Sequence, residues 1–329
     1  MENKKINKIA VLTSGGDAPG MNAAIRAVVR NAAYQNIGCV GVYRGYQGLV
    51  EKDFIELDAR SVKNIINRGG TFLKSARSKD FRTKEGQEKA YQNLKNENID
   101  ALIVIGGDGT FTGASVFSKA FDIPVIGIPG TIDNDIKGTD FTIGYDTALN
   151  TVVEAIDKIR DTASSHDRLF LIEVMGRDAG DIALNSGVGA GAEEILIPEE
   201  DRGIEHLLES LKKSRKSGKT SSIVVVAEGD QIGQNINKLS EDIQDNLPEY
   251  EVKVTVLGHI QRGGSPSCYD RVLASRLGVS AVDALIEGES NVMVGTRQKK
   301  IVYVDFDKTI GGKKKLDKEL IRVADIVST

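Results

Sequence analysis

Short apolar runs alternate with longer amphipathic runs along most of the chain. Several of the short runs are apolar at every position, as expected for strands buried on both faces of a parallel sheet, and they lie at residues 9–12, 39–43, 101–105, 125–128, 169–174, 194–197, 223–227 and 252–257. The longer runs repeat apolar residues at spacings of three and four, which predicts helices at residues 23–34, 84–95, 147–162, 204–216 and 270–287. This alternation predicts an α/β fold with largely parallel sheets.

The length of 329 residues predicts two lobes rather than one simple core. We expect two doubly wound, three-layer lobes with the active site in the cleft between them, one formed by residues 1–142 and 257–305 and the other by residues 143–256 and 306–329. Glycine turns follow several predicted strands, at residues 15–17, 106–109, 129–130 and 175–177. Because open α/β sheets bind ligands at the carboxyl ends of their strands, these turns are expected to line one ligand site.

Composition narrows the possible functions. The formal net charge of -4, the pI of about 5.6 and the lack of Trp argue against binding to nucleic acid or an anionic membrane surface, and the short basic runs at 212–213 and 313–315 are interpreted as solvated surface. Two cysteines predict no disulfide framework and fit a reducing cytoplasm. Three scattered histidines exclude a structural zinc site, and the apolar stretch at 9–12 is too short for a signal peptide or a membrane span.

The segment at residues 14–22 follows a predicted strand and opens a predicted helix. Its glycines would let backbone N–H groups approach a phosphate at a helix N-terminus. It fits neither standard nucleotide fingerprint, because Asp17 stands where the dinucleotide motif needs its second glycine, and Met21 and Asn22 replace the Lys and Ser/Thr of the P-loop. The simpler alternative is a tight turn in which Asp17 caps the helix.

The turn at residues 106–110 places Asp108 among glycines of the same kind. A carboxylate at a phosphate-binding turn is repulsive unless a cation intervenes, and Mg²⁺ held by one carboxylate together with substrate phosphates resolves the conflict. Asp108 is therefore the candidate magnesium ligand, directly or through water. The alternative is again a capping Asp beside a permissive glycine.

Asp133 and Asp135 lie just past another predicted strand, in the segment at residues 129–135. In an extended backbone these two side chains point the same way. An Asp accepts the hydroxyl proton in kinases, and close carboxylates can raise the pKa of one of them, which suits a base. The alternative is an Asx turn, since Asn and Asp are common turn formers.

Arginines near the glycine turns indicate an anionic substrate. The guanidinium fork binds two phosphate oxygens at once, and four such residues are present at Arg77, Arg168, Arg177 and Arg262. Taken singly, each arginine is better explained as a surface ion pair, and His259 as a structural histidine. Together they indicate a doubly anionic substrate.

Six blocks of the sequence resemble the bacterial ATP-dependent 6-phosphofructokinase family. They are residues 14–22 (SGGDAPGMN), 67–71 (NRGGT), 106–110 (GGDGT), 129–135 (PGTIDND), 175–177 (MGR) and 258–266 (GHIQRGGSP). The blocks stand in the family's order, and the match runs from about residue 8 to about residue 288. The resemblance implies ATP-dependent phosphorylation of D-fructose 6-phosphate at its 1-hydroxyl to fructose 1,6-bisphosphate plus ADP, the committed step of glycolysis.

The resemblance also implies a role for each matching position. The first lobe would bind ATP through Gly16, Tyr46, Arg77, Ser78, Gly107, Asp108, Gly109 and Thr110, with Asp108 at Mg²⁺. Asp133 would accept the proton of the 1-hydroxyl, Arg77 would neutralise the transferring group, and Thr131 and Asp135 would help to place substrate and metal. The second lobe would bind fructose 6-phosphate, whose contacts would be Thr131, Asp133, Met175, Gly176, Arg177, Glu228, His259 and Arg262. Arg168 and Lys253 would reach its 6-phosphate from a neighbouring subunit of a homotetramer.

Two glycines bear on the phosphoryl donor. Pyrophosphate-dependent relatives usually carry Asp in place of Gly109 and Lys in place of Gly130. A second carboxylate at position 109 would crowd the place of the ATP α-phosphate, so ATP is expected. A pyrophosphate-dependent kinase of the same fold and a non-catalytic nucleotide-binding subunit are the alternatives, and the intact Asp133, Asp108 and Arg77 argue against the second.

The family's effector pocket, which binds ADP or phosphoenolpyruvate, is matched only in part. The matching positions are Arg26, Arg30, Arg160, Gly191, Glu193 and Lys219. Ala59 stands where an Arg is common in enteric members, and Ser217 and Ser221 replace a Lys and a His. Lost positive charge should weaken the binding of anionic effectors, so we expect reduced or altered allosteric control. Lys253 replaces the usual Arg, which keeps the charge but not the fork.

Overall fold

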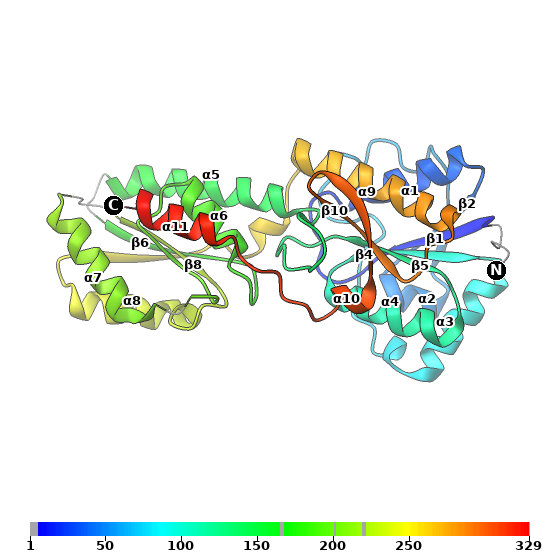
Figure 1. Ribbon diagram of the computed structural model, residues 1–329, viewed down its shortest axis with the longest axis horizontal. Helices are drawn as coiled ribbons and strands as arrows, with labels where there is room; N and C mark the ends of the chain where they lie inside the picture. Colours follow the sequence, from blue (N-terminus) through cyan, green and yellow to red (C-terminus); the bar gives the residue numbers. More distant parts are fainter. Residues whose placement is uncertain (1–5, 165–167, 201, 219–221, 329) are drawn as a thin grey trace. The chain divides into compact units, whose positions relative to one another are not determined.

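The computed structural model describes residues 6–164, 168–200, 202–218 and 222–328 (Figure 1). Contacts within the chain define two compact units. Unit 1 comprises Met1–Ile132, Ile136–Thr147 and Arg262–Lys314, and unit 2 comprises Asp133–Asp135, Ala148–Gln261 and Lys315–Thr329.

Unit 1 is built on a seven-stranded sheet in the order β11-β10-β5-β4-β1-β2-β3. The strands are β1 (Lys8–Thr13), β2 (Gly38–Val42), β3 (Phe54–Leu57), β4 (Ala101–Gly106), β5 (Val125–Pro129), β10 (Val292–Arg297) and β11 (Lys300–Asp305). All neighbours pair in parallel except the two edge strands, β3 and β11. The central strands β1, β4 and β5 are almost wholly buried, as the continuous apolar runs predicted.

Helices cover both faces of the unit 1 sheet. On one face lie α1 (Met21–Tyr34) and α9 (Cys268–Glu287), and on the other lie α2 (Gly45–Glu51), α3 (Lys84–Asn96), α4 (Asp108–Phe121) and α10 (Phe306–Thr309) (Figure 1). A buried cluster joins the sheet to the helices of the second face, and it includes the aromatic rings of Tyr46, Phe81, Phe111, Phe117 and Phe306. A short 3-10 helix, η1 (Asp80–Arg82), precedes α3.

Unit 2 is a smaller, wholly parallel sheet in the order β7-β8-β6-β9. Its strands are β6 (Arg168–Val174), β7 (Glu194–Leu196), β8 (Ser222–Ala227) and β9 (Glu251–Val256). One face carries α5 (Tyr145–Ser164), α6 (Asp181–Gly189) and α11 (Lys318–Val327), and the other carries α7 (Gly203–Lys216) and α8 (Ile236–Asn246) (Figure 1). Two 3-10 helices, η2 (Gly233–Asn235) and η3 (Gly258–Arg262), complete the elements.

The predicted α/β fold with mostly parallel sheets is confirmed. Every predicted strand and helix is present, with bounds within two residues of the expectation. The sequence reading did not identify several elements, among them β3, α4, α6, β10, β11 and α11. In the described part of the chain, no helix is long and apolar enough to cross a membrane.

Residues 306–314 pack with unit 1, whereas the sequence assigned them to the other lobe. They follow β11, which pairs with β10, so the chain stays beside the unit 1 sheet. Lys313 forms an isolated antiparallel β-bridge with Ile136. Lys314 Nζ donates a hydrogen bond of 2.6 Å to the carbonyl oxygen of Asp140. The interpretation of the 313–315 run as solvated surface is therefore wrong for Lys314.

Candidate active site

The two glycine–Asp turns lie against each other in unit 1. The backbone N–H of Ser14 donates to the carbonyl oxygen of Ile105 at 3.0 Å, and Thr110 Oγ1 donates back to the carbonyl oxygen of Ser14 at 3.1 Å. A Cβ on Gly106 would clash with both Thr110 and Ser14, so the approach needs glycine. Turns that stand some 90 residues apart in the sequence thus form one surface at the carboxyl ends of β1 and β4.

Asn22 ties a third segment to this surface. Its Nδ2 donates to the carbonyl oxygens of Arg68 and Gly69 at 3.2 and 3.1 Å, and its Oδ1 accepts from the N–H of Phe72 at 2.8 Å. Ser75 Oγ donates to the carbonyl oxygen of Gly15 at 2.8 Å. The glycine block at residues 67–71 therefore packs at the start of α1, through an asparagine whose role the sequence reading did not find.

Arg262 lies on the first glycine turn rather than away from it. Its Nη1 donates to the carbonyl oxygen of Asp17 at 3.2 Å, and a Cβ on Gly16 would stand only 2.7 Å from the same nitrogen. The sequence reading assigned Gly16 to ATP and Arg262 to the sugar phosphate. Within unit 1 the structure brings these two residues into contact.

Asp108 begins α4, and its carboxylate is half-buried. Asp108 Oδ1 accepts a hydrogen bond of 2.8 Å from the backbone N–H of Gly311, a contact that no sequence motif indicated. The described residues contain no group of three or more His, Cys, Asp or Glu side chains that could hold a metal ion. A single carboxylate completed by substrate phosphates and water is the usual magnesium environment in such sites, so the residues present fit Mg²⁺.

Gly109 faces open space. A Cβ built there would meet no atom within 4 Å, and the residue is exposed in the first turn of α4. Gly130 is different, because a Cβ there would stand 3.1 Å from Ile105 and 3.2 Å from Met21. A side chain could therefore be added at 109 without strain, whereas at 130 the neighbours would have to move.

Tyr46 supports the second turn from within the core. Only 7% of the residue is exposed, its ring stacks on Phe81 with centroids 4.3 Å apart, and its hydroxyl donates to the carbonyl oxygen of Thr110 at 2.5 Å. Burial raises the pKa of the Tyr46 hydroxyl. Its contact with a nucleotide would therefore be made through the backbone of Thr110.

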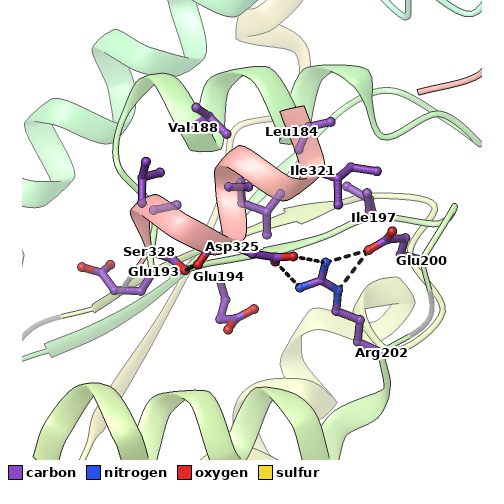
Figure 2. Close-up of a pocket in the computed structure, with 14 residues that line it drawn as sticks. Leu184, Val188, Glu193, Glu194, Ile197, Glu200, Arg202, Ile321, Asp325 and Ser328 are labelled. Atoms are coloured by element: carbon purple, nitrogen blue, oxygen red, sulfur yellow. Dashed lines mark hydrogen bonds and ion pairs between the residues drawn. The ribbon is translucent and has the colours of Figure 1, made fainter. Parts of the chain in front are cut away.

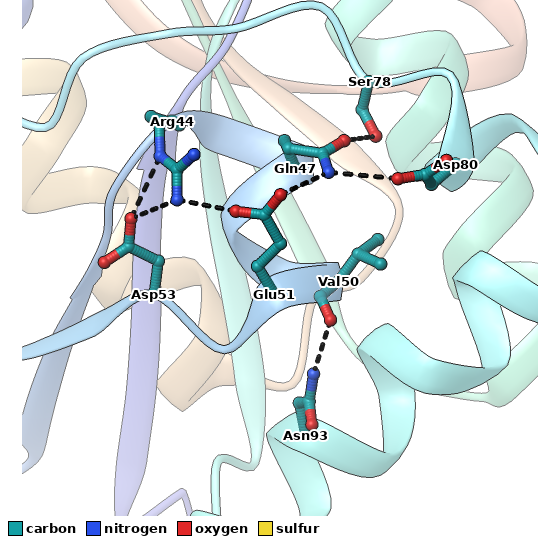
Figure 3. A network of polar contacts seen from close by, with 8 residues as sticks. All are labelled: Arg44, Gln47, Val50, Glu51, Asp53, Ser78, Asp80 and Asn93. Atoms are coloured by element: carbon teal, nitrogen blue, oxygen red, sulfur yellow. Dashed lines mark hydrogen bonds and ion pairs between the residues drawn. The ribbon is translucent and has the colours of Figure 1, made fainter.

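Ser78 belongs to a polar network beside this turn (Figure 3). Its Oγ donates to Gln47 Oε1 at 2.7 Å, and Gln47 Nε2 donates to Glu51 Oε1 at 2.7 Å. Glu51 in turn accepts from Arg44 at 2.6 Å. The neighbouring Arg77 is exposed. Gln47 thus holds the hydroxyl of Ser78 in place, a role that no sequence motif around Gln47 indicated.

Asp133 is almost fully buried and contacts Arg177. Only 1% of the aspartate is exposed, and its Oδ2 lies 3.4 Å from Arg177 Nε, whose side chain is 62% exposed. Asn134 is in the left-handed region with φ 52°, and its Nδ2 donates to Asp181 Oδ1 at 3.3 Å. The expected extended backbone is therefore wrong here: residues 132–133 form a turn, and the turn alternative describes the backbone. Thr131 is buried in unit 1, and Asp135 is half-buried in unit 2.

Glu228 and Gln261 shape the loop at residues 175–177. Glu228 Oε1 accepts from the N–H groups of Gly176 and Arg177 at 3.2 and 2.7 Å. Gln261, which is wholly buried, accepts from the N–H of Met175 at 3.1 Å. The sequence reading named Glu228 as a substrate contact and missed Gln261, although the residue lies inside the block at 258–266. His259, in the same 3-10 helix, is exposed.

Arg168 and Lys253 meet at a shared carboxylate. Arg168 Nε and Lys253 Nζ lie 2.8 and 2.7 Å from the two oxygens of Glu251, on the neighbouring strands β6 and β9. Arg168 and then Lys253 lower the pKa of Glu251 to about 2. Arg168 and Lys253, the two predicted phosphate ligands, are therefore adjacent, as binding of one shared anion requires. Glu251 lies between them and accepts from both, a role that the sequence did not indicate.

The predicted effector residues fall into separate groups. In unit 2, Arg160 Nη2 donates to the carbonyl oxygens of Ala190 and Gly191 at 2.7 Å, and its Nη1 lies 3.8 Å from the buried Glu193. In unit 1, Arg26 and Arg30 lie on α1, where burial and then Arg30 lower the pKa of Arg26. Lys219 lies outside the described residues.

The C-terminal helix α11 packs on α6, and the pocket beside it is also lined by Glu193 and by Glu194 of β7 (Figure 2). Arg202 holds it there, because the guanidinium donates to Glu200 Oε2 at 2.7 Å and to Asp325 Oδ1 at 2.6 Å. These hydrogen bonds raise the pKa of Arg202. The sequence reading gave this segment no role.

Comparison with known proteins gives consistent matches. A family model described as phosphofructokinase matches residues 8–285. ATP-dependent 6-phosphofructokinase 2 of Bacteroides thetaiotaomicron is 55% identical over 315 residues, covering 96% of each chain. ATP-dependent 6-phosphofructokinase of Listeria monocytogenes serotype 4b is 54% identical over 323 residues, covering 98% of this chain and 100% of the relative. The solved phosphofructokinase of Saccharomyces cerevisiae superposes with a TM-score of 0.87 at 37% identity, covering 98% of this chain and 50% of that one.

Proposed function

The chain belongs to the phosphofructokinase family, and we propose that its unit 1 turns bind the phosphoryl donor while Asp133 and Arg177 act on the acceptor. The reaction is the transfer of a phosphoryl group from ATP to the 1-hydroxyl of fructose 6-phosphate, a step of glycolysis. The names of near-full-length relatives at 55% and 54% identity support this activity. The contact between the two glycine–Asp turns is the observation that best supports a nucleotide site in unit 1.

Backbone groups of unit 1 would bind the ATP phosphates. The proposed contacts are Gly16, Arg77, Ser78, Gly107, Asp108, Gly109 and Thr110, with Tyr46 acting through Thr110. The exposed Arg77 would neutralise charge on the transferring group. The absence of a carboxylate at Gly109 supports ATP as donor, because a carboxylate there would repel the phosphates of the nucleotide.

We propose Mg²⁺ as the cofactor, with Asp108 as its protein ligand. The N–H of Gly311 donates to Oδ1 of Asp108 and so orients the carboxylate, which would hold the metal. When bound, the metal would neutralise phosphate charge during the transfer. Asp135 would help to place substrate and metal, as the family resemblance implies.

Asp133 would accept the proton of the 1-hydroxyl as the phosphoryl group arrives. Burial excludes water from this carboxylate, and Arg177 orients it from 3.4 Å. Thr131 would position the acceptor. Because Glu228 and Gln261 hold the N–H groups of the 175–177 loop, they would set the position of Arg177 against the substrate.

The sugar phosphate would be bound by cationic and polar groups from several loops. The proposed contacts are Met175, Gly176, Arg177, Glu228, His259 and Arg262, together with Arg168 and Lys253 from a neighbouring subunit of a homotetramer. The adjacency of Arg168 and Lys253 supports their binding of one phosphate, which would replace Glu251 as their partner.

Regulation and location are further parts of the proposal. Arg26, Arg30, Arg160, Gly191, Glu193 and Lys219 would bind ADP or phosphoenolpyruvate, with weakened control because Ala59, Ser217 and Ser221 lack the positive charge of the family pattern. The free thiols of Cys39 and Cys268 support a reducing cytoplasm as the site of action.

The test is identification of the product by ³¹P NMR. Protein supplied with fructose 6-phosphate, ATP and Mg²⁺ should form fructose 1,6-bisphosphate and ADP in equal amounts. Replacing ATP by pyrophosphate should abolish product formation. Hydrolysis of ATP without a bisphosphate signal would contradict the proposed acceptor, and faster reaction with pyrophosphate would contradict the donor.

A further inference from the structure

The segment after β11 forms one wall of a pocket in unit 1. The pocket has a volume of about 490 Å³, and its polar lining includes Lys137, Arg297, Tyr303, Lys308, Gly311 and Gly312. The lining comes from the β10–β11 hairpin, from α10 with the residues that follow it, and from the loop around Lys137. None of these residues takes part in the mechanism proposed above, except Gly311 through its contact with Asp108.

The charges of this pocket are not balanced. Its two acidic residues already have partners, since Asp305 lies 2.6 Å from Lys308 Nζ and Asp307 lies 2.6 Å from Lys119 Nζ. The side chains of Lys137 and Arg297 have no hydrogen-bond or ion-pair acceptor among the residues that the structure describes. Two positive charges therefore remain for a ligand.

Lys137 packs against the backbone of the pocket wall, with Arg297 in the same lining. A Cβ on Gly312 would stand 2.6 Å from Lys137 Cδ, so the stem of this lysine lies directly on the glycine backbone. Lys137 and Arg297 both line this pocket. A guanidinium binds two oxygens of a phosphate group in parallel, and an ammonium group adds a third contact.

We propose that this pocket binds a phosphate group, free or carried by a small phosphate ester, as an anion site distinct from the glycine turns. Gly311 links this pocket to the turn at residues 106–110, because Gly311 lines the pocket and its backbone N–H donates to the carboxylate of Asp108. An occupant that shifts the 310–312 backbone changes the orientation of Asp108. This coupling rests on the proposed function of Asp108, whereas binding at the pocket does not.

The first test measures binding rather than activity. Inorganic phosphate is titrated calorimetrically into protein saturated with a non-hydrolysable ATP analogue and fructose 6-phosphate, so that the substrate phosphate sites are filled. Lys137→Gln and Arg297→Gln should each raise the dissociation constant for phosphate about tenfold. Lys299→Gln, which removes the same charge from the turn of the same hairpin but does not line the pocket, should leave it unchanged.

Repeating the titration with a phosphate ester distinguishes the possible ligands, and comparing wild type with the variants tests the site. Tighter binding of β-glycerophosphate than of inorganic phosphate would assign the site to phosphate esters, and the reverse order to free phosphate. Equal affinity in wild type and in both pocket variants would overturn the proposal, as would the absence of any binding at millimolar phosphate.

The second test measures coupling. Phosphate should change the KM for ATP several-fold in the wild type and in Lys299→Gln, and should leave it unchanged in the double variant Lys137→Gln/Arg297→Gln. Coupling between binding affinities is reciprocal, so phosphate and a non-hydrolysable ATP analogue should change each other's dissociation constant by the same factor. Phosphate binding without any change in the KM for ATP would overturn the coupling and retain the site. Absence of ATP-dependent activity in the wild type, with phosphate binding at the pocket intact, would overturn the proposed function and retain the site.

Discussion

Replacing Gly109 by Asp should weaken ATP binding through charge alone. A Cβ at this position meets no atom within 4 Å, and Gly109 is not among the glycines with positive φ, so the new side chain introduces neither clash nor backbone strain. It also stands in the first turn of α4, where a carboxylate stabilises the helix by about 0.3–1 kcal/mol. The fold is therefore expected to keep or slightly raise its Tm.

The size of the effect follows from Coulomb's law. A carboxylate about 5–8 Å from one phosphate charge, at an effective dielectric constant of about 20, is repelled by about 2–3 kcal/mol. That corresponds to a rise in the KM for ATP of about 30- to 300-fold. Gly109→Asn has nearly the same shape without the charge, and should change this KM by less than about threefold.

The assay is steady-state phosphorylation of fructose 6-phosphate with ATP varied, repeated for both variants at two salt concentrations. The difference between Asp and Asn should shrink at higher salt, because exposed charges are screened. Equal values of KM for the two variants would refute the electrostatic argument. An unchanged KM in both would show that position 109 does not face the nucleotide.

Three further predictions follow from the site and its supports. Asp133→Asn should lower kcat at least about a hundredfold while the affinity for ADP, measured by titration, changes less than about twofold, because only the proton acceptor is lost; near-normal turnover would remove Asp133 from the mechanism. Gln261→Leu should raise the KM for fructose 6-phosphate and leave the KM for ATP unchanged, because the N–H of Met175 loses its acceptor, and an equal rise in both would indicate a general loss of folding. Burial raises the pKa of the Asp270 carboxyl from 3.8 to about 6. Its contribution to the free energy of unfolding is therefore complete below pH 4 and is lost as the pH rises through 6. The difference corresponds to about 3 kcal/mol, and urea unfolding of Asp270→Asn should show a correspondingly flatter fall in stability between pH 4 and pH 7 than the wild type; parallel profiles would contradict this assignment.

The apolar periodicity was sufficient for the framework of the fold. Strands such as β1 and β4 are buried on both faces and therefore read as unbroken apolar runs. Helix α4 was missed because its first turn, Asp108-Gly109-Thr110, was interpreted only as part of a candidate phosphate-binding turn. Helix α11 has apolar residues at helical spacing, but its place could not be predicted, because its attachment depends on Arg202, more than 100 residues away in the sequence.

The sequence indicated candidate site residues where the proposed chemistry is carried by side chains of unusual type and spacing. Asp108, Asp133 and Arg177 all stood out for this reason. The groups that hold them did not, because Gly311 acts through its backbone and Gln261 through a buried amide, and neither residue type signals such a role. The geometry at Asn134 also lay beyond the sequence, since a left-handed residue between two aspartates cannot be told from an extended one by spacing.

The most direct test of the account is the rate of fructose 6-phosphate phosphorylation by the purified protein, measured in parallel with ATP and with pyrophosphate in the presence of Mg²⁺. We expect turnover with ATP, little or none with pyrophosphate, and loss of the ATP-dependent rate in Asp133→Asn. Turnover with pyrophosphate alone, or an ATP-dependent rate that survives in Asp133→Asn, would contradict the account.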